Sequence, residues 1–236
     1  MMSRNMFYSR TRNLIGDNAL EKLRNSSVAV FGIGGVGGYV AEILARSGVG
    51  RLVLIDGDRV EESNLNRQII ATRTTLGMPK VTAMAERIAS INPDCKVVAI
   101  ESRFNADNLD KFDFDYDYIA DCIDSVKDKQ LLILTAKDKN IPIICAMGAG
   151  NRSGLPEYKL ADIHKTSYDP LAKVIRKFCV QEGVKKLNVV YTTQPTIKTD
   201  SGVASIAYHP MSMASIISAK IVNDLIKKEK DYGNDE

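Results

Sequence analysis

The sequence contains few cysteines, and none of them is paired in a motif. There are four in 236 residues, and no C-x-x-C spacing joins any two of them. A structural zinc site built from paired thiolates is therefore not expected. A chain of this length buries a large core without disulfides. Sparse, unpaired cysteines are typical of a reduced compartment, so we expect a cytoplasmic protein.

Long hydrophobic runs are also absent. The N-terminus has no apolar core of a signal peptide, and no stretch approaches the ~20 apolar residues that a membrane-spanning helix needs. The helical segment 211–225 is apolar on one side and polar on the other, which is typical of a packed amphipathic helix. Because no repeat or flexible linker divides the chain, we expect one domain over residues 1–236.

A strong overall charge is lacking too. The net charge is +3, which by itself indicates no partner. The distribution is uneven, because residues 151–198 hold nine Lys or Arg and four Asp or Glu. A basic surface of this kind suits a polyanion such as RNA. A solvated helix face explains the same charge equally well.

Short apolar runs alternate with helical patterns in the first half of the chain. Five strands and three helices are expected, with strands at 27–32, 51–56, 96–100, 117–121 and 142–147 and helices at 36–47, 78–91 and 126–139. This order predicts an α/β fold with a doubly wound, mostly parallel, Rossmann-like sheet that binds ligands at the carboxyl ends of its strands. Additional C-terminal elements are expected to extend the sheet, with strands at 157–163, 187–193 and 202–208 and a helix at 170–182.

A glycine-rich segment, residues 32–37 (GIGGVG), follows the first strand and opens a helix. Glycines allow a tight turn and let backbone amides approach a phosphate, while the helix N-terminus supplies free N–H donors. Asp56 closes the next strand, where an acid contacts ribose hydroxyls in this kind of fold. The pattern alone does not separate NAD from ATP, so a dehydrogenase stays open at this point.

The segment after Asp56 is rich in amide and charged side chains (residues 56–68, DGDRVEESNLNRQ). A nicotinamide enzyme keeps its cofactor's phosphates intact and needs no such groups. An enzyme that splits the α–β phosphate bond must neutralise a triphosphate, and Arg67 and Lys80 suit that task. Asp124 ends a further strand, where a carboxylate is suited to hold Mg²⁺ on phosphate oxygens. A helix N-cap is an equally good explanation of Asp124.

These segments, together with Lys80 in G-M-P-K and Asp124 in D-C-I-D-S, resemble the E1-like adenylation domain over roughly residues 7–150. The resemblance implies ATP and Mg²⁺ as cofactors, with Asp56 on the ribose, Asn64, Arg67 and Lys80 on the phosphates, and Asp124 on the metal. The full set of nucleotide-binding residues that it implies is Gly32, Gly34, Gly35, Gly37, Asp56, Asp58, Asn64, Asn66, Arg67, Gln68 and Lys80.

The N-terminal run 8–11 (YSRT) resembles the element through which the same family sends an arginine across a dimer interface to the γ-phosphate. This implies a homodimer and a catalytic role for Arg10, with Arg12 as the alternative. Residues of about 151–230 would then serve substrate binding and dimerisation, and those of about 7–150 nucleotide binding.

Residues 162–172 (DIHKTSYDPLA) resemble the signature of the tRNA threonylcarbamoyladenosine dehydratase branch, although Asp169-Pro170 is also a good helix start. The resemblance implies tRNA as the substrate, with ATP-dependent cyclisation of N6-threonylcarbamoyladenosine at position 37 through an acyl adenylate. The resemblance also implies an AMP-forming, ligase-like dehydratase. The candidate substrate-binding residues are His164, Lys165, Thr166, Lys173 and Arg176.

Other interpretations stay open. An adenylyltransferase that activates a sulfur-carrier or ubiquitin-like protein has the same fold, but such enzymes commonly carry the cysteine pairs that are missing here. A nucleotide-binding protein without catalysis is a third reading. The resemblance also leaves room for a sulfur-transfer protein as a partner. The oxygen-rich carbonyls of residues 148–150 are a candidate site for a monovalent cation, Na⁺ or K⁺. Cys179 is a candidate reactive thiol, whereas His209, which precedes a proline, is expected to be structural.

Overall fold

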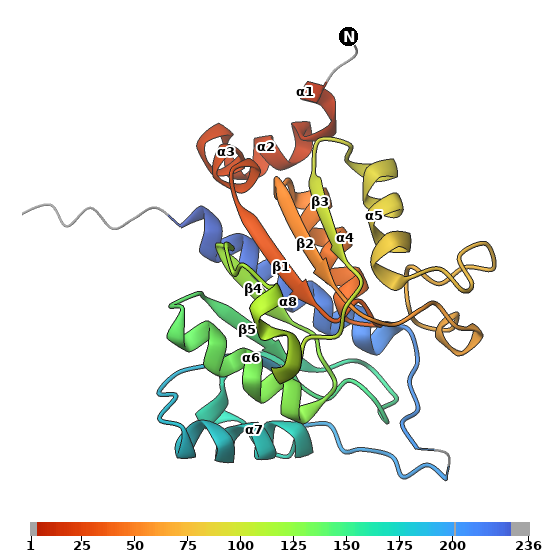
Figure 1. Ribbon diagram of the computed structural model, residues 1–236, viewed down its shortest axis with the longest axis vertical. Coiled ribbons are helices and arrows are strands. Elements are labelled where there is room, and N and C mark those ends of the chain that lie inside the picture. Colours follow the sequence, from red (N-terminus) through yellow and green to blue (C-terminus); the bar gives the residue numbers. More distant parts are fainter. Residues whose placement is uncertain (1–3, 201, 228–236) are drawn as a thin grey trace, which may run out of the picture.

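A seven-stranded β-sheet runs through the centre of the molecule (Figure 1). The structure is a computed structural model that describes residues 4–200 and 202–227. The strand order is β3-β2-β1-β4-β5-β7-β6, and every pairing is parallel except that of β6 with β7. The strands are β1 (Ser27–Phe31), β2 (Arg51–Ile55), β3 (Lys96–Ile100), β4 (Tyr118–Asp121), β5 (Ile143–Ala146), β6 (Tyr158–Asp162) and β7 (Asn188–Thr192).

Helices cover both faces of the sheet (Figure 1). One face carries α4, α5 and α8, and the other carries α6 and α7. Their bounds are α4 (Gly37–Ser47), α5 (Lys80–Ile91), α6 (Val126–Asp138), α7 (Pro170–Gln181) and α8 (Tyr208–Ile226). Alternate strand residues enter the two cores: Val28 and Val30 pack with α4 and α8, whereas Ala29 and Phe31 pack toward α6. Strands buried on both faces explain the continuous apolar runs in the sequence.

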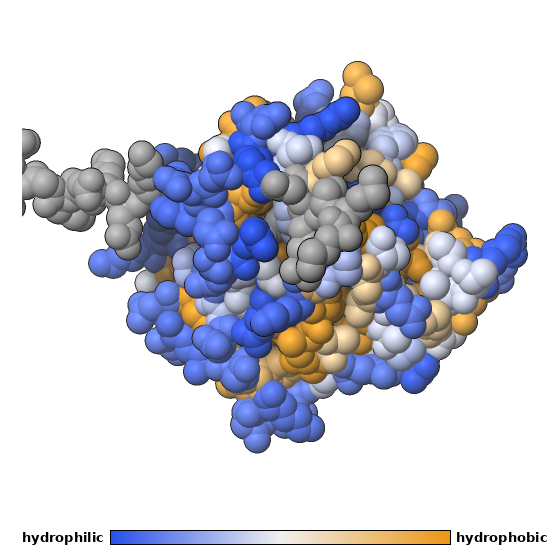
Figure 2. Space-filling model, turned by 90° about the horizontal axis from the view of Figure 1, so that it is seen from above, coloured by the Kyte–Doolittle hydropathy of each residue, from blue (hydrophilic) through white to orange (hydrophobic). Residues whose placement is uncertain are grey.

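Three short helices precede the sheet, and the sequence patterns did not reveal them. They are α1 (Arg4–Phe7), α2 (Ser9–Ile15) and α3 (Asp17–Arg24), and they lie at the amino ends of the strands (Figure 1). Tyr8 anchors them, because it is buried and its hydroxyl accepts a hydrogen bond from Asn92 Nδ2 at 2.8 Å. Seen from this end, the surface is mainly hydrophilic, with apolar residues gathered in its lower centre (Figure 2).

The predicted doubly wound sheet and its C-terminal extension are confirmed, and the predicted strands up to residue 193 lie within two residues of the observed ones. The strand predicted at 202–208 is wrong. The chain from Gly202 to Ala207 is irregular, and α8 begins at Tyr208. Ala204 bonds through both its N–H and its carbonyl to Asn151, so a loop replaces the neighbouring strand that a ladder requires. Three 3₁₀ turns, η1 (Glu62–Asn64), η2 (Ala106–Lys111) and η3 (Ile163–Lys165), complete the description.

Within residues 4–200 and 202–227, no helix combines the length and the apolar character that crossing a membrane requires.

A buried ion pair joins α6 to the end of β4. Lys129 and Asp121 have no exposed side-chain surface, and Lys129 Nζ lies 2.8 Å from Asp121 Oδ2. The other oxygen of Asp121 accepts a hydrogen bond from the backbone N–H of Ile123 at 3.1 Å. The pair therefore orders the loop that leads from β4 to Asp124. Removal of one partner from such a pair leaves an uncompensated charge in the core.

We expect Lys129→Met to lower the free energy of unfolding by about 3–5 kcal/mol, because it keeps the volume but strands the Asp121 carboxylate. Urea denaturation followed by circular dichroism measures this. The matched control is Lys127→Met on the exposed face of the same helix, which should stay within about 0.5 kcal/mol of wild type. Equal stabilities of the two variants would show that the pair contributes nothing to the fold.

Candidate functional site

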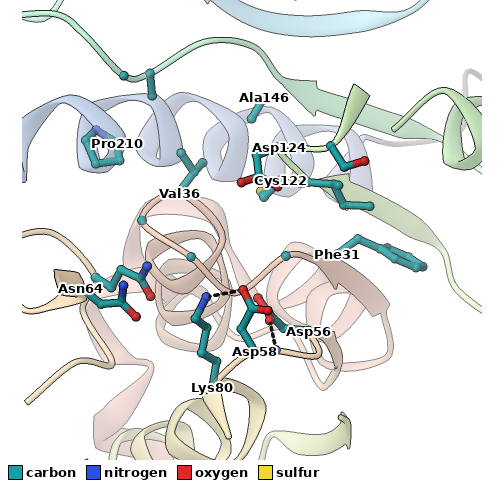
Figure 3. A pocket seen from close by; sticks show the side chains of 18 of the residues that line it. Phe31, Val36, Asp56, Asp58, Asn64, Lys80, Cys122, Asp124, Ala146 and Pro210 are labelled. Carbon is teal, nitrogen blue, oxygen red and sulfur yellow. Dashed lines mark hydrogen bonds and ion pairs between the residues drawn. The ribbon is translucent and has the colours of Figure 1, made fainter. Parts of the chain in front are cut away.

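A cleft of about 700 Å³ opens at the carboxyl ends of the parallel strands. The loops that follow β1, β2, β3, β4 and β5 all contribute to its lining. Figure 3 shows part of the cleft from close by. These loops supply the glycine turn, the acidic and cationic segment after Ile55, residues 102–104, residues 122–125 and residues 146–150. The cleft therefore lies where a doubly wound sheet binds its ligands, as the sequence predicts.

The glycine turn is shaped by close backbone contacts. Gly32 has a φ of +86°, and a Cβ there would lie 2.8 Å from the Cys122 carbonyl oxygen. A Cβ at Gly37 would lie 1.8 Å from the carbonyl oxygen of Gly32. Gly34, by contrast, meets nothing closer than Gln68 Nε2 at 4.0 Å. Two glycines are therefore required by packing, and the third leaves the backbone open toward the cleft.

Helix α4, which follows this turn, presents free backbone N–H donors at its start. α4 begins at Gly37, and no side chain caps its N-terminus. Gly34, Gly35 and Val36 line the cleft just before it. Uncapped N–H groups and the helix dipole favour an anion at this point. Gly37 itself does not line the cleft, so its contribution to the predicted phosphate site is through the shape of the turn.

Asp56 lies beneath the glycine turn and is half-buried. Its Oδ2 accepts a hydrogen bond from Ile33 N at 2.7 Å, and its Oδ1 accepts one from Asp58 N at 2.8 Å. The carboxylate is thereby fixed between the loops that follow β1 and β2, and it lines the cleft. This position agrees with the predicted ribose contact, which stays a prediction.

Asp58 joins two cations at the edge of the cleft, Lys80, which is labelled in Figure 3, and Arg103. Lys80 Nζ lies 3.0 Å from Asp58 Oδ2, and Arg103 Nη2 lies 2.7 Å from Asp58 Oδ1. Partial burial opposes ionisation of Asp58, but the hydrogen bonds from Lys80 and Arg103 outweigh it and lower the pKa of the carboxyl. Lys80 is nearly buried, whereas the Arg103 side chain is 76% exposed. No sequence motif indicated Arg103, whose only signal is that it follows β3.

Most of the amide and arginine residues that were predicted to bind the nucleotide line the cleft. Asn64 is buried and accepts a hydrogen bond from Glu61 N at 3.1 Å, and Arg67 Nη1 donates to the Ser63 carbonyl at 2.8 Å. Both line the cleft, as does Gln68, whose buried Oε1 has no hydrogen-bond partner among the described residues. A buried acceptor without a partner is costly, so a ligand donor would satisfy it.

Asn66 lies outside the lining of the cleft. Its Nδ2 donates instead to the Ser205 carbonyl at 2.9 Å, and Ser205 does line the cleft. The side chain thus holds the segment before α8 against the site rather than facing a ligand in this arrangement.

Asp124 faces Asp56 and Asp58 across the cleft (Figure 3). It is exposed and lies three residues beyond the end of β4, not at its last residue. The N-cap of α6 is Ser125, whose Oγ accepts from Asp128 N at 3.5 Å. The alternative explanation of Asp124 as a helix cap is therefore wrong, and its carboxylate is turned to the cleft.

A second buried ion pair supports the wall formed by residues 148–150. Arg152 Nη2 lies 3.2 Å from Asp169 Oδ2, and both side chains are almost fully buried. Arg152 also donates to the carbonyls of Gly148 and Gln194. Asp169 caps α7 by accepting from Ala172 N, which confirms the predicted helix start. The predicted monovalent cation at residues 148–150 stays a prediction, and one of these carbonyls already faces a guanidinium.

The five predicted substrate-binding residues lie outside the cleft. Arg176 Nη1 donates to Thr166 Oγ1 at 2.7 Å, so these two side chains bind each other. His164 Nε2 contacts the Val184 carbonyl at 2.9 Å. Lys165 and Lys173 are exposed. A role in binding a large substrate at the surface stays a prediction for all five, and Leu171 of the same signature does reach the cleft.

Two predictions concern residues far from the cleft. Arg10 lies on α2, at the amino ends of the strands, so the cleft of the same chain does not include it. Its predicted role across a dimer stays a prediction. Cys179 is buried, and burial raises the pKa of its thiol to about 11, so the prediction of a reactive thiol there is wrong. His209 was expected to be structural; it is fully buried, and its Nδ1 lies 3.1 Å from the Tyr158 hydroxyl.

The fold and the cleft together define a doubly wound nucleotide-binding protein with cations and acids set around a glycine turn. The sequence profile described as the ThiF family matches residues 8–234. The chain belongs to the ThiF family.

Similar proteins cover almost the whole chain. The tRNA threonylcarbamoyladenosine dehydratase of Bacillus subtilis is 39% identical over 93% of this chain and 94% of its own length. Crystal structures of the Escherichia coli tRNA N6-threonylcarbamoyladenosine dehydratase in complex with ATP and with AMP superpose with a TM-score of 0.89. They are 31% identical and cover 96% of both chains. The Escherichia coli sulfur carrier protein ThiS adenylyltransferase is 36% identical over only 61% of this chain and 59% of its own length.

The geometry of the glycine turn predicts opposite outcomes for two neighbouring substitutions. Gly37→Ala should destabilise the fold by about 1–3 kcal/mol or more, because its Cβ would overlap the Gly32 carbonyl. Gly34→Ala should keep near-wild-type stability, since its Cβ points into open space. Thermal denaturation of both proteins checks this. If Gly37→Ala melted at the wild-type temperature, the packing account of the turn would be rejected.

Proposed function

We propose that the chain is an ATP-dependent tRNA threonylcarbamoyladenosine dehydratase that acts on the modified adenosine at position 37. The observation that carries the proposal is a cleft that sets Lys80 and Arg67 beside an open glycine turn, in a chain similar to such dehydratases from end to end. The likeness to a sulfur-carrier adenylyltransferase covers much less of the chain.

ATP lies in this proposal with its phosphates over the glycine turn. Gly34 and Gly35 allow the phosphates to approach the backbone, and the uncapped start of α4 stabilises their charge. Arg67, whose side chain lies against Gly35, and Lys80 supply positive charge beside the turn. Asp56, between the loops that follow β1 and β2, holds the ribose.

The residues of the cleft fit a magnesium ion that is shared with the nucleotide. Among the described residues, no group of three His, Cys, Asp or Glu side chains is close enough to hold a metal alone. Mg²⁺ commonly takes one or two carboxylates and completes its shell with water and phosphate oxygens. Asp124, exposed in the cleft, is the carboxylate that would hold it. When bound, the ion would neutralise charge on the phosphates.

The reaction then needs no nucleophile from the enzyme. The free carboxylate of the threonylcarbamoyl group attacks the α-phosphorus of ATP, the bond to the β-phosphate oxygen breaks, and pyrophosphate leaves. A nearby atom of the same group then displaces AMP from the acyl adenylate and closes a ring, so the tRNA loses the elements of water. Cys122 is the cysteine nearest the site, and burial and Asp121 raise the pKa of its thiol to about 12, which disfavours a thiolate. Positioning and charge stabilisation are the enzyme's contribution.

The test of the proposal is mass spectrometry of the position-37 nucleoside in tRNA from a deletion strain, with and without the gene restored. We expect the cyclised nucleoside to disappear in the deletion and to return on complementation. In vitro, AMP and pyrophosphate should form with modified tRNA. AMP formation with a sulfur-carrier protein, and none with tRNA, would replace the proposal by an adenylyltransferase.

Lys80→Ala and Asp124→Ala should each reduce AMP formation by at least about 100-fold while the protein stays folded. Lys80→Ala removes a positive charge beside the phosphates, and Asp124→Ala removes the carboxylate that would hold Mg²⁺. Single-turnover assays with radiolabelled ATP measure AMP, and circular dichroism checks the fold. Lys127→Ala, which lies outside the cleft, is the control with wild-type turnover expected. Wild-type rates in either cleft variant would refute the phosphate and metal assignments.

The exposed basic residues of α7 are the proposed contact with tRNA. Lys173→Glu combined with Lys177→Glu should weaken tRNA binding and reduce the dependence of log K on log salt by roughly one to two units of slope. ATP affinity should not change, because neither residue lines the cleft. Arg176 is left intact, since it holds Thr166. The double variant Lys96→Glu with Lys111→Glu is the control, and an equal effect there would exclude α7 as the specific contact.

A further inference from the structure

One end of the cleft is apolar and lies apart from Arg67 and Lys80. Phe31, Ile55, Phe104 and Ile123 line it. In Figure 3 Phe31 and Asn64 stand at opposite ends, with Asp56 and Asp58 between them. Because the phosphates belong at the end with Asn64, Lys80 and Arg67, and the ribose at Asp56, the base of the nucleotide belongs in the apolar end.

Arg103 lies directly over the loop that leads into this apolar end. A Cβ on Gly57 would come within 2.7 Å of Arg103 Cγ and 2.8 Å of Arg103 N. The arginine can therefore cross this point only because residue 57 has no side chain. Phe104, the next residue, is buried in the aromatic core beside Phe31 and holds the loop from below.

The guanidinium of Arg103 is held in place although it is exposed. Asp58 binds it at 2.7 Å, and Asp56 and Asp124 add weaker attraction. A long side chain that is already restrained loses little rotamer freedom when a ligand packs against it. Arg59 also lines the cleft, but its guanidinium binds Glu101 and the Gly77 carbonyl at 3.0 Å each.

We propose that Arg103 closes the base end of the cleft by stacking its guanidinium on the adenine ring of the bound nucleotide. A planar guanidinium packs face to face on aromatic rings and is attracted to them. The inference rests on the proposed function only in taking ATP as the nucleotide. The contact is the same in ATP, in the acyl adenylate and in AMP, so it contributes uniform binding.

The proposal predicts a particular pattern of affinities. Arg103→Ala should weaken ATP and AMP binding by the same factor, about fivefold. Binding of tripolyphosphate, which has no base, should not change. Arg103→Lys keeps the charge but loses the plane, so it should lose most of the same affinity. In turnover, the KM for ATP should rise while kcat stays at the wild-type value.

Isothermal titration calorimetry of the wild type, Arg103→Ala, Arg103→Lys and Arg73→Ala with ATP, AMP and tripolyphosphate tests this. Arg73→Ala is the matched control, because Arg73 is exposed and does not line the cleft, and it should bind all three like the wild type. A larger loss for ATP than for AMP, or weaker tripolyphosphate binding, would mean that Arg103 contacts phosphate and would overturn the proposal. Wild-type affinity in Arg103→Ala, or in Arg103→Lys, would overturn it as well.

The outcome is separable from that of the proposed function. The binding measurements use nucleotides alone, whereas the dehydratase assignment depends on AMP formation with modified tRNA. If the wild-type protein bound ATP and AMP but formed no AMP with modified tRNA, the dehydratase assignment would be refuted. The binding measurements would still decide the role of Arg103.

Discussion

The site depends on how closely the backbone packs where β1 ends. The chain can reverse from β1 into α4 only if Gly37 lies against the Gly32 carbonyl and Gly32 against the Cys122 carbonyl. These contacts bring the end of β4 next to the end of β1. The loops after β2 and β4 then face each other across the turn. The carboxylates of Asp56 and Asp124 therefore lie on opposite walls of one cleft. Because Gly32 and Gly37 leave no room for a side chain, the backbone contacts at these two positions determine where the charged residues of the cleft lie.

Two buried ion pairs connect the loops of the cleft to helices α6 and α7. Lys129 and Asp121 fix α6 beneath the loop that carries Asp124, and Arg152 and Asp169 fix the start of α7 to the wall after β5. Both pairs have further hydrogen bonds to backbone groups, which offset the cost of removing the charges from water. The Asp169 of the dehydratase-like signature is therefore structural, and Leu171 of the same signature lines the cleft.

The sequence predicted the parts of this protein in which neighbouring residues determine the structure. Short sequence patterns predicted the strands, the glycine turn and the positions of Lys80 and Arg67. In each case a few neighbouring residues determine the local structure. Arg103 and Arg152 were missed because both lie in loops without a motif. Each forms an ion pair with a residue that is distant in the sequence, Arg103 with Asp58 and Arg152 with Asp169. The segment 202–208 was misassigned because its alternation of apolar residues resembles a strand, while its partner is a loop around Asn151. Tertiary contacts overrode local preference at each of these places.

The position of α2 restricts how Arg10 can act. In Figure 1 the helix lies at the amino ends of the strands. The cleft lies at their carboxyl ends. A five-residue strand such as β1 is about 16 Å long, which exceeds the reach of an arginine side chain. Any contact between Arg10 and a nucleotide must therefore involve the cleft of a second copy. A catalytic arginine at this position and a monomeric enzyme are mutually exclusive, so the oligomeric state of the active protein decides whether the first helices belong to the site.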